Sequence, residues 1–443
     1  MKGAELQPIA WSWEIDGWII LAGALCAVAA ALLGNFLVLR RMSLMGDAIS
    51  HAVLPGLAAA FLLSGQRQGI VMFIGAAAVG VVTVVLTELA RQYGRVDEGA
   101  AIGVVFTFLF ALGLVMIVQA ADHVDLDPGC VLYGALETTV LDQVAIAGWL
   151  VPRTVVTLSI VLLANTALVL GLYRQLKVST FDPQLAASQG IPVTFLHYLL
   201  AAFVAITSVA AFESVGNILV VAMFVVPPSA AWLLTDRLSV MIGLSALIGI
   251  ACAILGHIAA IAIPPWFGYP AANTAGMMAV AAGAMLLLAV LLAPRKGLLS
   301  RSLRSLRVAL QILGEDVLAA LYRAELNGQP AIATTQLRSQ LLVPRFRAGL
   351  VLWWLRVQHL VTQQAGQLSL HGEGRRQAQN VVRSHRLWEQ YLASEAGLPD
   401  QLLHGGAERL EHFTNRTLRE RLLEETNEPD VDPHGAPIPP EAQ

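Results

Sequence analysis

The chain has 443 residues, of which 56% are hydrophobic and only 13% are charged. Soluble globular proteins average about 25% charged residues, so this composition excludes an ordinary soluble enzyme and a disordered chain. The net charge of −3 also argues against a globally basic nucleic-acid-binding protein.

The charged residues are unevenly distributed along the chain. Residues 1–299 contain 12 Lys and Arg and 15 Asp and Glu, or 27 of 299, which is about 9%. Residues 300–443 contain 16 Arg and 16 acidic residues, or 32 of 144, about 22%, which is near the soluble norm. The sequence therefore predicts a membrane part followed by a soluble part.

The first part contains apolar stretches long enough to cross a bilayer, which takes about 20 residues per helix. The predicted spans are roughly 17–39, 44–64, 69–90, 100–119, 154–173, 192–212, 215–234, 239–263 and 273–293. The stretches 44–64 and 215–234 are the weakest, so both eight and nine spans remain open. The predicted fold is an all-α polytopic membrane protein.

Basic residues orient these spans, because cytoplasmic loops are enriched in Lys and Arg. With the N-terminus outside, the outer loops carry only Arg67 and Arg153. The inner loops then carry Arg40, Arg41, Arg91, Arg95, Arg174, Lys177, Arg237, Arg295 and Lys296. This orientation predicts that the soluble C-terminal part is cytoplasmic.

One inner loop, Lys177–Pro192, reads KVSTFDPQLAASQGIP. Asp182 and Pro183 are typical of a helix start and Gly190 of a helix end, so the loop is expected to contain a short helix. That helix is either an ordinary surface helix or a coupling helix on which an ATPase acts. The chain contains no GxxxxGK[ST] motif, so a separate subunit would have to hydrolyse ATP.

Charged residues at membrane depth are costly and usually functional. Asp47 and His51 are four residues apart and therefore share one helix face. A carboxylate with an imidazole suits Mn²⁺, Fe²⁺ or Zn²⁺, and the alternative is a hydrogen bond that locks two helices. Glu213, between two apolar spans, either lines the same path or ends a helix at the surface.

Three motifs point to a known family. Gly34–Pro55, GNFLVLRRMSLMGDAISHAVLP, strongly resembles the signature of the ABC-type manganese/zinc/iron permease family. The stretches DLDPGCVLYG at Asp125–Gly134 and STFDPQLAASQG in the inner loop resemble further landmarks of that family. The resemblance covers about residues 15–295.

This resemblance implies the membrane subunit of an ATP-driven divalent metal importer in a bacterial inner (plasma) membrane. The implied partners are a cytoplasmic ABC ATPase subunit, an extracytoplasmic metal-binding protein and a second permease subunit, identical or related. The chain itself would be a transporter subunit and not an enzyme. Asp47 and His51 are implied to contact the ion in the pathway. The implied ATPase-coupling helix includes Phe181, Asp182, Pro183, Ala186 and Gly190.

The soluble part is expected to contain a winged-helix domain. The domains predicted are a permease at 1–295, a basic linker at 296–311 that contacts anionic membrane lipid, and a cytoplasmic domain at 312–443. The last contains a helix at Glu315–Leu326, two helices at Thr334–Leu342 and Pro344–Gln358, and a two-stranded wing at Leu360–Leu370.

Histidines and carboxylates recur after this wing at helical spacing. His385 and Glu389 are four residues apart, and Glu408, Glu411 and His412 are expected on one helix face, with His404 one turn earlier. Imidazole and carboxylate without thiolate favour Mn²⁺, Fe²⁺ or Zn²⁺ as the bound ion. The alternative is a charged helix surface with paired side chains.

A second resemblance covers roughly residues 312–440. Gly372–Leu392, Leu398–His412 and Asp432–Pro439 look like the metal-dependent repressor family that includes the diphtheria toxin repressor and the manganese transport regulator. It implies a winged helix followed by a metal-binding dimerisation domain. One implied ligand set is Asp316, His385, Glu408, Glu411 and His412, and a competing ancillary set is His385, Glu389 and His404. Glu408 stands where the iron type has Cys, which favours Mn²⁺.

The chain departs from the repressor pattern at two places. Ala319 stands where the manganese type has a second acidic ligand. The expected recognition helix begins with Arg345 and Arg347, which could contact DNA, but then turns apolar with Trp353 and Trp354.

The leading hypothesis is a metal ABC permease, importing Mn²⁺ or else Fe²⁺ or Zn²⁺, whose tail senses metal and regulates transport. One alternative is a permease fused to a DNA-binding repressor. Another is a secondary transporter driven by protons. The sequence leaves open which metal is carried and whether the permease pairs with itself.

Overall fold

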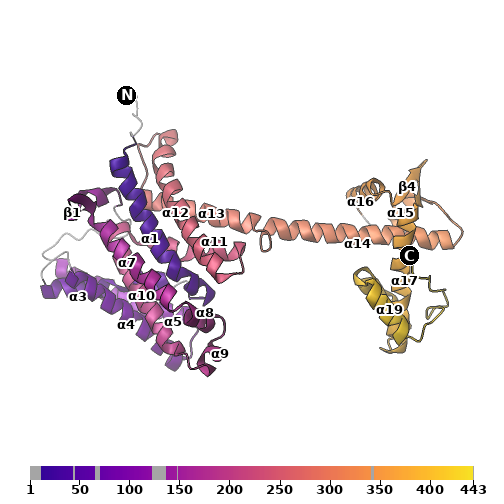
Figure 1. The fold of residues 1–443 in the computed structure, drawn as a ribbon, viewed down its shortest axis with the longest axis horizontal. Helices are drawn as coiled ribbons and strands as arrows, with labels where there is room; N and C mark the ends of the chain where they lie inside the picture. The colour runs from indigo at the N-terminus through magenta and orange to yellow at the C-terminus, as the bar shows by residue number, and fades with distance from the viewer. Residues whose placement is uncertain are drawn as a thin grey trace. The chain divides into compact units, whose positions relative to one another are not determined.

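The structure is a computed structural model. It describes residues 11–42, 45–64, 70–121, 136–146, 148–340 and 344–442. Contacts divide the chain into two compact units, residues 1–300 and 301–443 (Figure 1). The division falls close to the point at which the charged fraction of the sequence rises.

The first unit is a bundle of membrane-length helices. Eight helices in the described part of the chain are long and apolar enough to cross a membrane. They are α1 (Trp13–Leu39), α4 (Ile70–Gly94), α5 (Glu98–Ala121), α7 (Arg153–Gly171), α10 (Val193–Val215), α11 (Asn217–Leu234), α12 (Leu238–Ala262) and α13 (Thr274–Leu292). The prediction of a multi-pass helical protein is confirmed, with the smaller of the two expected numbers of long spans.

The predicted span 44–64 is divided into two shorter helices, α2 (Met45–Ala52) and α3 (Leu54–Ser64). Pro55 explains the division, because it has no N–H to donate to the carbonyl of His51 and its ring disfavours a continuous helix. Proline is well tolerated in the first turn of a helix, where α3 holds it.

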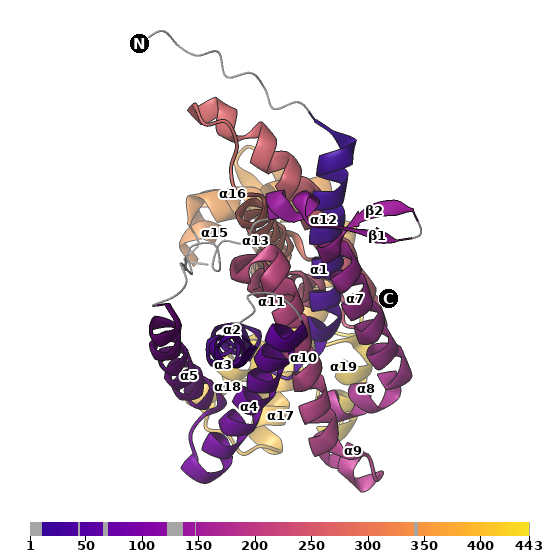
Figure 2. The same cartoon turned by 90° about the vertical axis from the view of Figure 1, so that its left-hand side faces the viewer.

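Helix α1 lies in the middle of the unit, against α7, α11 and α12 (Figure 2). Gly34 permits the close approach to α11, since a Cβ at this position would overlap the carbonyl oxygen of Phe224. Neutral polar pairs join other helices: Asn35 Nδ2 donates to Ser245 Oγ over 2.8 Å. Asn165 Nδ2 donates to Thr207 Oγ1 over 2.9 Å. His257 Nε2 on α12 also lies 2.9 Å from Asp16 Oδ1 on α1. Close packing, neutral hydrogen bonds and this one His–Asp contact therefore help to hold the described part of the bundle together.

Shorter elements connect the long helices. They are η1 (Leu136–Leu141), the antiparallel strands β1 (Gln143–Ile146) and β2 (Trp149–Pro152), α8 (Tyr173–Phe181), α9 (Pro183–Ser188) and η2 (Pro264–Phe267). Helix α9 confirms the short helix expected after Asp182. The family-like stretch 125–134 lies outside the described residues.

The second unit begins within a long helix, α14 (Leu298–Leu326), which includes most of the expected linker. The other elements are β3 (Ile332–Ala333), α15 (Thr334–Gln340), α16 (Arg345–Val357), β4 (Val361–Gln364), β5 (Gln367–Leu370), α17 (Gly372–Ser394), α18 (Asp400–Leu410), η3 (Glu411–Phe413) and α19 (Arg416–Glu425). The strands form an antiparallel sheet in the order β3-β5-β4, with Val361 opposite Leu370. The two helices and the wing that the sequence predicted are therefore present.

A small apolar core holds α14 and α16 against the sheet, with Leu318, Leu355 and Leu368 fully buried. Helix α17 follows the sheet directly and packs against α18, η3 and α19. This arrangement brings residues of α14, α17, α18 and η3 together, although they lie up to 97 positions apart in the sequence.

Candidate metal sites

The candidate pathway site lies on α2. The Nε2 atom of His51 is 3.1 Å from Asn217 Nδ2, at the first turn of α11. The rings of Phe106 and Phe110, both on α5, lie 6.1 and 5.8 Å from the imidazole, measured between centroids. Asp47 lies one helical turn before His51 on α2, but its side chain is outside the described residues, as is that of Glu213.

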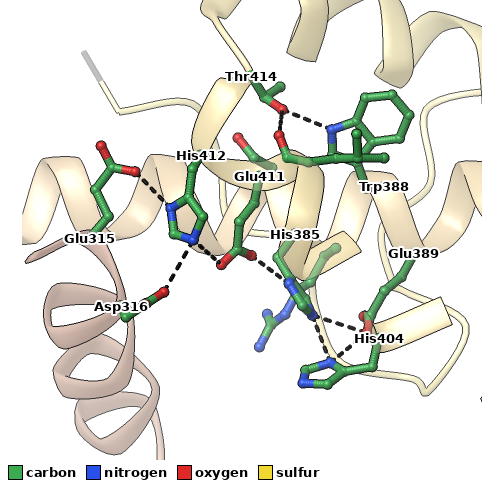
Figure 3. Close-up of polar contacts among 12 residues, drawn as sticks. Glu315, Asp316, His385, Trp388, Glu389, His404, Glu411, His412 and Thr414 are labelled. Carbon is green, nitrogen blue, oxygen red and sulfur yellow. Dashed lines mark hydrogen bonds and ion pairs between the residues drawn. The ribbon is translucent and has the colours of Figure 1, made fainter. Parts of the chain in front are cut away.

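The second unit contains a compact group of three candidate ligands, His385 and Glu389 on α17 and His404 on α18 (Figure 3). His385 Nε2 lies 3.0 Å from Glu389 Oε1 and 2.9 Å from His404 Nδ1. His404 Nδ1 lies 3.1 Å from the same Glu389 oxygen. His385 and Glu389 are buried and His404 is exposed, so an ion could enter from the side of His404. We name these three residues the α17 group.

A second group joins Asp316 on α14 to Glu411 and His412 on η3. His412 Nε2 lies 3.2 Å from Asp316 Oδ1 and 3.5 Å from Glu411 Oε1. The other ring nitrogen, Nδ1, lies 2.8 Å from Glu315 Oε2. A carboxylate in that position orients the ring and strengthens its capacity as a ligand. We name Asp316, Glu411 and His412 the η3 group.

Glu411 connects the two groups. One of its oxygens faces His412, and the other lies 2.5 Å from His385 Nδ1 (Figure 3). The sequence suggested two ligand sets that compete for His385. In the structure the α17 group and the η3 group have no residue in common, and the contact between His385 and Glu411 joins them.

Burial and charge act in opposite directions on these residues. Burial alone would lower the pKa of His412, but hydrogen bonds with Asp316 and Glu315 outweigh it and raise the pKa to about 10. The pKa of His385 is also raised, because hydrogen bonds to Glu389 and Glu411 overcome the effect of burial. Burial would raise the pKa of Glu389, whereas hydrogen bonds from His385 and His404 lower it to about 2. Without metal, the clusters are therefore held together by attraction between protonated imidazoles and ionised carboxylates.

The end of α18 determines which carboxylates enter the clusters. The helix stops at Leu410, whose carbonyl accepts a hydrogen bond from Thr414 Oγ1, and Thr414 in turn accepts one from Trp388 Nε1. The chain turns into η3 there, so Glu411 and His412 point toward α14 and α17. Glu408 remains on α18, exposed, and belongs to neither group, so the expected common face is not formed.

Two residues that the sequence interpretation did not include lie at the clusters. Glu315 contacts His412, and its position next to Asp316 was the available signal. His434 Nε2 lies 4.0 Å from Glu389 Oε1, close enough to join an ion bound to the α17 group after a small movement. Ala319, which stands where the manganese-type repressors have a second acidic ligand, is buried.

The ligand atoms of each group lie within 4.8 Å of one another. Carboxylates and imidazoles of this kind suit Mn²⁺, Fe²⁺ or Zn²⁺ better than copper(I). The free cysteines described, Cys26 and Cys252, are both in the first unit. Both clusters therefore have the chemistry of a divalent metal site.

The expected coupling helix is well defined. Asp182 accepts a hydrogen bond from Leu185 N over 2.9 Å and thus caps α9, and Gly190 ends the turn with a φ of 76°. Phe181, the last residue of α8, is exposed, and Ala186 on α9 is buried, so the segment presents an apolar surface residue directly before the capped helix.

The helix expected to read DNA presents an apolar surface. Phe346 and Trp353 on α16 are 79% and 60% exposed. Arg347 is exposed, and the side chain of Arg345 is outside the described residues. Exposed aromatic residues where phosphate-contacting groups are usual argue against a DNA-reading helix.

A bundle of membrane-length helices, followed by a winged helix with two imidazole–carboxylate clusters, defines a transporter-like membrane protein with a regulator-like tail. The chain belongs to the ABC 3 transport family, whose model matches residues 13–293. Residues 372–440 match the metal binding and dimerisation domain of the iron dependent repressors. Both resemblances inferred from the sequence are thereby confirmed.

Known relatives cover the membrane unit. The manganese transport system membrane protein MntD of Bacillus subtilis (strain 168) is 42% identical over 296 residues, which is 67% of this chain and 98% of MntD. The zinc transport system membrane protein TroD of Treponema pallidum (strain Nichols) is 36% identical over 307 residues, 69% of this chain and 82% of TroD. PsaBC from Streptococcus pneumoniae, solved in complex with Fab, is 30% identical with a TM-score of 0.52, covering 63% of this chain and 92% of that chain.

Proposed function

We propose that the chain is the permease subunit of an ATP-driven Mn²⁺ importer whose C-terminal tail binds the same ion and regulates transport. The observation that carries the proposal is that both units of one chain present the same ligand chemistry. His51 lies beside Asn217 in an ABC 3 permease unit, and the tail holds two imidazole–carboxylate clusters.

In this mechanism an extracytoplasmic binding protein delivers the ion to the outer mouth of a permease dimer. Asp47 and His51 replace part of the ion's hydration shell while it passes. A separate ATPase subunit hydrolyses ATP and drives the change of access through Phe181–Gly190. The capped helix α9 supports this role, since a rigid short helix can transmit displacement. Anionic lipid would contact Arg301, Arg304 and Arg307 near the start of α14, on the cytoplasmic side.

In the tail, an arriving ion would replace the protons that hold the carboxylates and imidazoles together. The clusters join α14 to α17, α18 and η3, so binding there changes the charge between elements that are far apart in the sequence. Regulation then requires that the loaded and empty tails favour different transport states.

Uptake of radioactive Mn²⁺ and Zn²⁺ into cells that lack other importers tests the proposal. The Asp47→Ala variant should abolish uptake with folded protein retained in the membrane. The Asn35→Ser variant, altered at a buried polar residue bonded to Ser245, is the matched control and should still transport. Normal uptake by Asp47→Ala would contradict the pathway assignment. Faster uptake of Zn²⁺ than of Mn²⁺ by the unaltered chain would show that Zn²⁺, and not Mn²⁺, is the transported ion.

Deletion of residues 312–443 tests the tail. Metal accumulation should then rise under replete conditions, because the inhibition by bound metal is lost. Unchanged accumulation would contradict regulation of transport. The winged-helix fold keeps a DNA-binding repressor, freed by cleavage, as a second candidate. Metal-dependent binding of the chain to the importer's promoter at low salt would support it over regulation of transport.

A further inference from the structure

We propose that Asn217 is a further ligand of the transported ion and that its side-chain oxygen acts beside His51. This inference rests on the proposed function, because it extends the pathway site of Asp47 and His51 from α2 to a second helix, α11. It also assigns the chain a preference for a hard divalent cation such as Mn²⁺.

The contact between the two side chains is direct. Asn217 Nδ2 and His51 Nε2 are 3.1 Å apart, although the residues lie 166 positions apart in the sequence. A half turn of the amide would exchange its nitrogen and oxygen, which ordinary structural data hardly distinguish. The Oδ1 atom and Nε2 would then lie side by side, both with lone pairs. Adjacent ligands of an octahedral ion with bonds of about 2.1 Å are about 3.0 Å apart, so the spacing suits a shared ion.

The side-chain oxygen of Asn217 also lacks a hydrogen-bond donor among the described residues. The residue is 4% exposed, and no donor in the described part of the chain reaches Oδ1. A buried amide oxygen without a hydrogen bond costs about 1–3 kcal/mol. Asn165, equally buried, differs because Thr207 bonds to both its nitrogen and its oxygen. The half turn of the amide would move the Asn217 oxygen from a position where no described residue donates to it to the side of His51, where a bound ion would be its partner.

The surrounding backbone and side chains direct the amide to this place. Gly216 has a φ of 89°, a left-handed conformation that suits glycine, and this tight turn between α10 and α11 brings Asn217 next to α2. Phe106 and Phe110 line another side of the imidazole with apolar rings. An amide oxygen is a hard ligand, which suits Mn²⁺ more than Zn²⁺.

The experiment measures uptake of radioactive Mn²⁺, with Zn²⁺ as competitor, by the full chain with its ATPase and binding protein. Asn217→Leu keeps the approximate shape and removes the oxygen. Its KM for Mn²⁺ should rise by at least about tenfold, the loss typical even of residues that only orient a ligand. The advantage of Mn²⁺ over Zn²⁺ should shrink. Asn217→Asp, which keeps an oxygen, should retain uptake near that of the unaltered chain.

Rates are normalised to folded chain, and Asn165→Leu is the matched control. It should reduce the amount of folded chain while KM and the Mn²⁺/Zn²⁺ ratio stay constant. Wild-type KM and ratio in Asn217→Leu would overturn the inference. Equal loss of maximal rate in the Leu and Asp variants at unchanged KM would also overturn it, because that result indicates a structural role. Failure of the unaltered chain to import either metal would instead overturn the proposed function.

Discussion

His51 in the membrane unit lies beside Asn217 and two phenyl rings, one helical turn after Asp47 on α2, whereas His412 in the tail lies among Glu315, Asp316 and Glu411. The same difference extends to the packing of each unit. Asn–Ser and Asn–Thr pairs and one His–Asp pair join the membrane helices, whereas Arg–Glu and His–Glu pairs predominate in the described part of the tail.

Under the proposed function, this difference would let one chain treat one ion in two ways. A site of passage must release its ion, so a few ligands that replace only part of the hydration shell suit it. A site that reports concentration must hold the ion long enough to change the protein, and concentrated charge provides that affinity. Stability should differ in the same sense: close packing contributes most in the membrane unit, whereas buried charge adds a dependence on pH to the apolar core of the tail.

The largest effect is expected where the membrane unit packs most closely. Gly34→Ala would force a Cβ onto the carbonyl oxygen of Phe224, a backbone atom that cannot move aside cheaply. We expect a loss of about 3 kcal/mol or more and little folded chain in the membrane. Gly283→Ala is the control, because nothing lies within 4 Å of that position. Equal yields of the two variants by fluorescence-detected size exclusion would contradict this account of the packing.

A slightly smaller effect is expected in the tail from Glu411→Gln. The substitution removes the charge that faces both His385 and His412 and leaves the two imidazoles with fewer partners. Breaking a buried charged pair costs about 3 kcal/mol. Hydrogen exchange should show weaker protection of α17 and α18 with α1 unchanged, and Mn²⁺ should no longer protect the tail. Retained Mn²⁺ protection would remove Glu411 from the ligand set.

The pH dependence should separate the two units further. The pKa of His412 is raised to about 10, so its stabilisation is fully present below the unfolded value of 6.5 and is lost as pH rises through 10. Without metal, the tail should lose about 1–2 kcal/mol between pH 6.5 and 10, a value reduced because Asp316 and Glu315 are partly exposed to solvent.

Hydrogen exchange at several pH values measures this slope for each unit. The His412→Gln variant should lack it, and α7, which contains no acidic residue or histidine, should lack it in both proteins. A slope of equal size in the variant would assign the titration to another group. Mn²⁺ should weaken the slope, because an ion needs the neutral imidazole and displaces its proton.

Much of this arrangement could be predicted from local patterns. Apolar length predicted the long helices, and the spacing of His385 and Glu389 predicted their contact. Apolar length alone predicts one span at 44–64, whereas Pro55 is the sequence signal for its division into α2 and α3. Glu408 shows where local reasoning stops: its absence from the clusters depends on the end of α18 at Leu410 and on a turn that Trp388 and Thr414 stabilise from outside the helix.

Contacts between residues that are distant in the sequence were the hardest to predict from the sequence. Asn217 is neutral and lies in an apolar stretch, so neither charge nor periodicity distinguishes it from other buried polar residues. Its relation to His51 arises only when α11 packs beside α2. In the tail, the resemblance to the repressors supplied Asp316, which spacing alone could not have connected to His412.

A moderate effect is expected at the coupling loop. Asp182→Ala removes the side-chain cap of α9, worth about 1 kcal/mol, and should loosen a helix of only six residues. We expect ATPase activity of the complex to persist while metal uptake per ATP falls several-fold. Gln184→Ala, an exposed position on the same helix, is the control and should couple normally. Unchanged uptake per ATP in Asp182→Ala would make α9 an ordinary surface helix.

The smallest effect distinguishes buried charge from charge in general. Arg416 and Glu420 form an exposed pair one helical turn apart on α19, with a separation of 2.9 Å. Solvent screens such a pair, so Glu420→Gln should change the stability of the tail by only about 0.3–0.5 kcal/mol. Glu441→Gln is the contrasting variant, since Glu441 lies between the largely buried Arg383 and Arg419 and its pKa is lowered by the hydrogen bond from Arg419. It should destabilise the tail clearly more. If both variants had the same small effect, the number of charges and not their burial would distinguish the tail from the membrane unit.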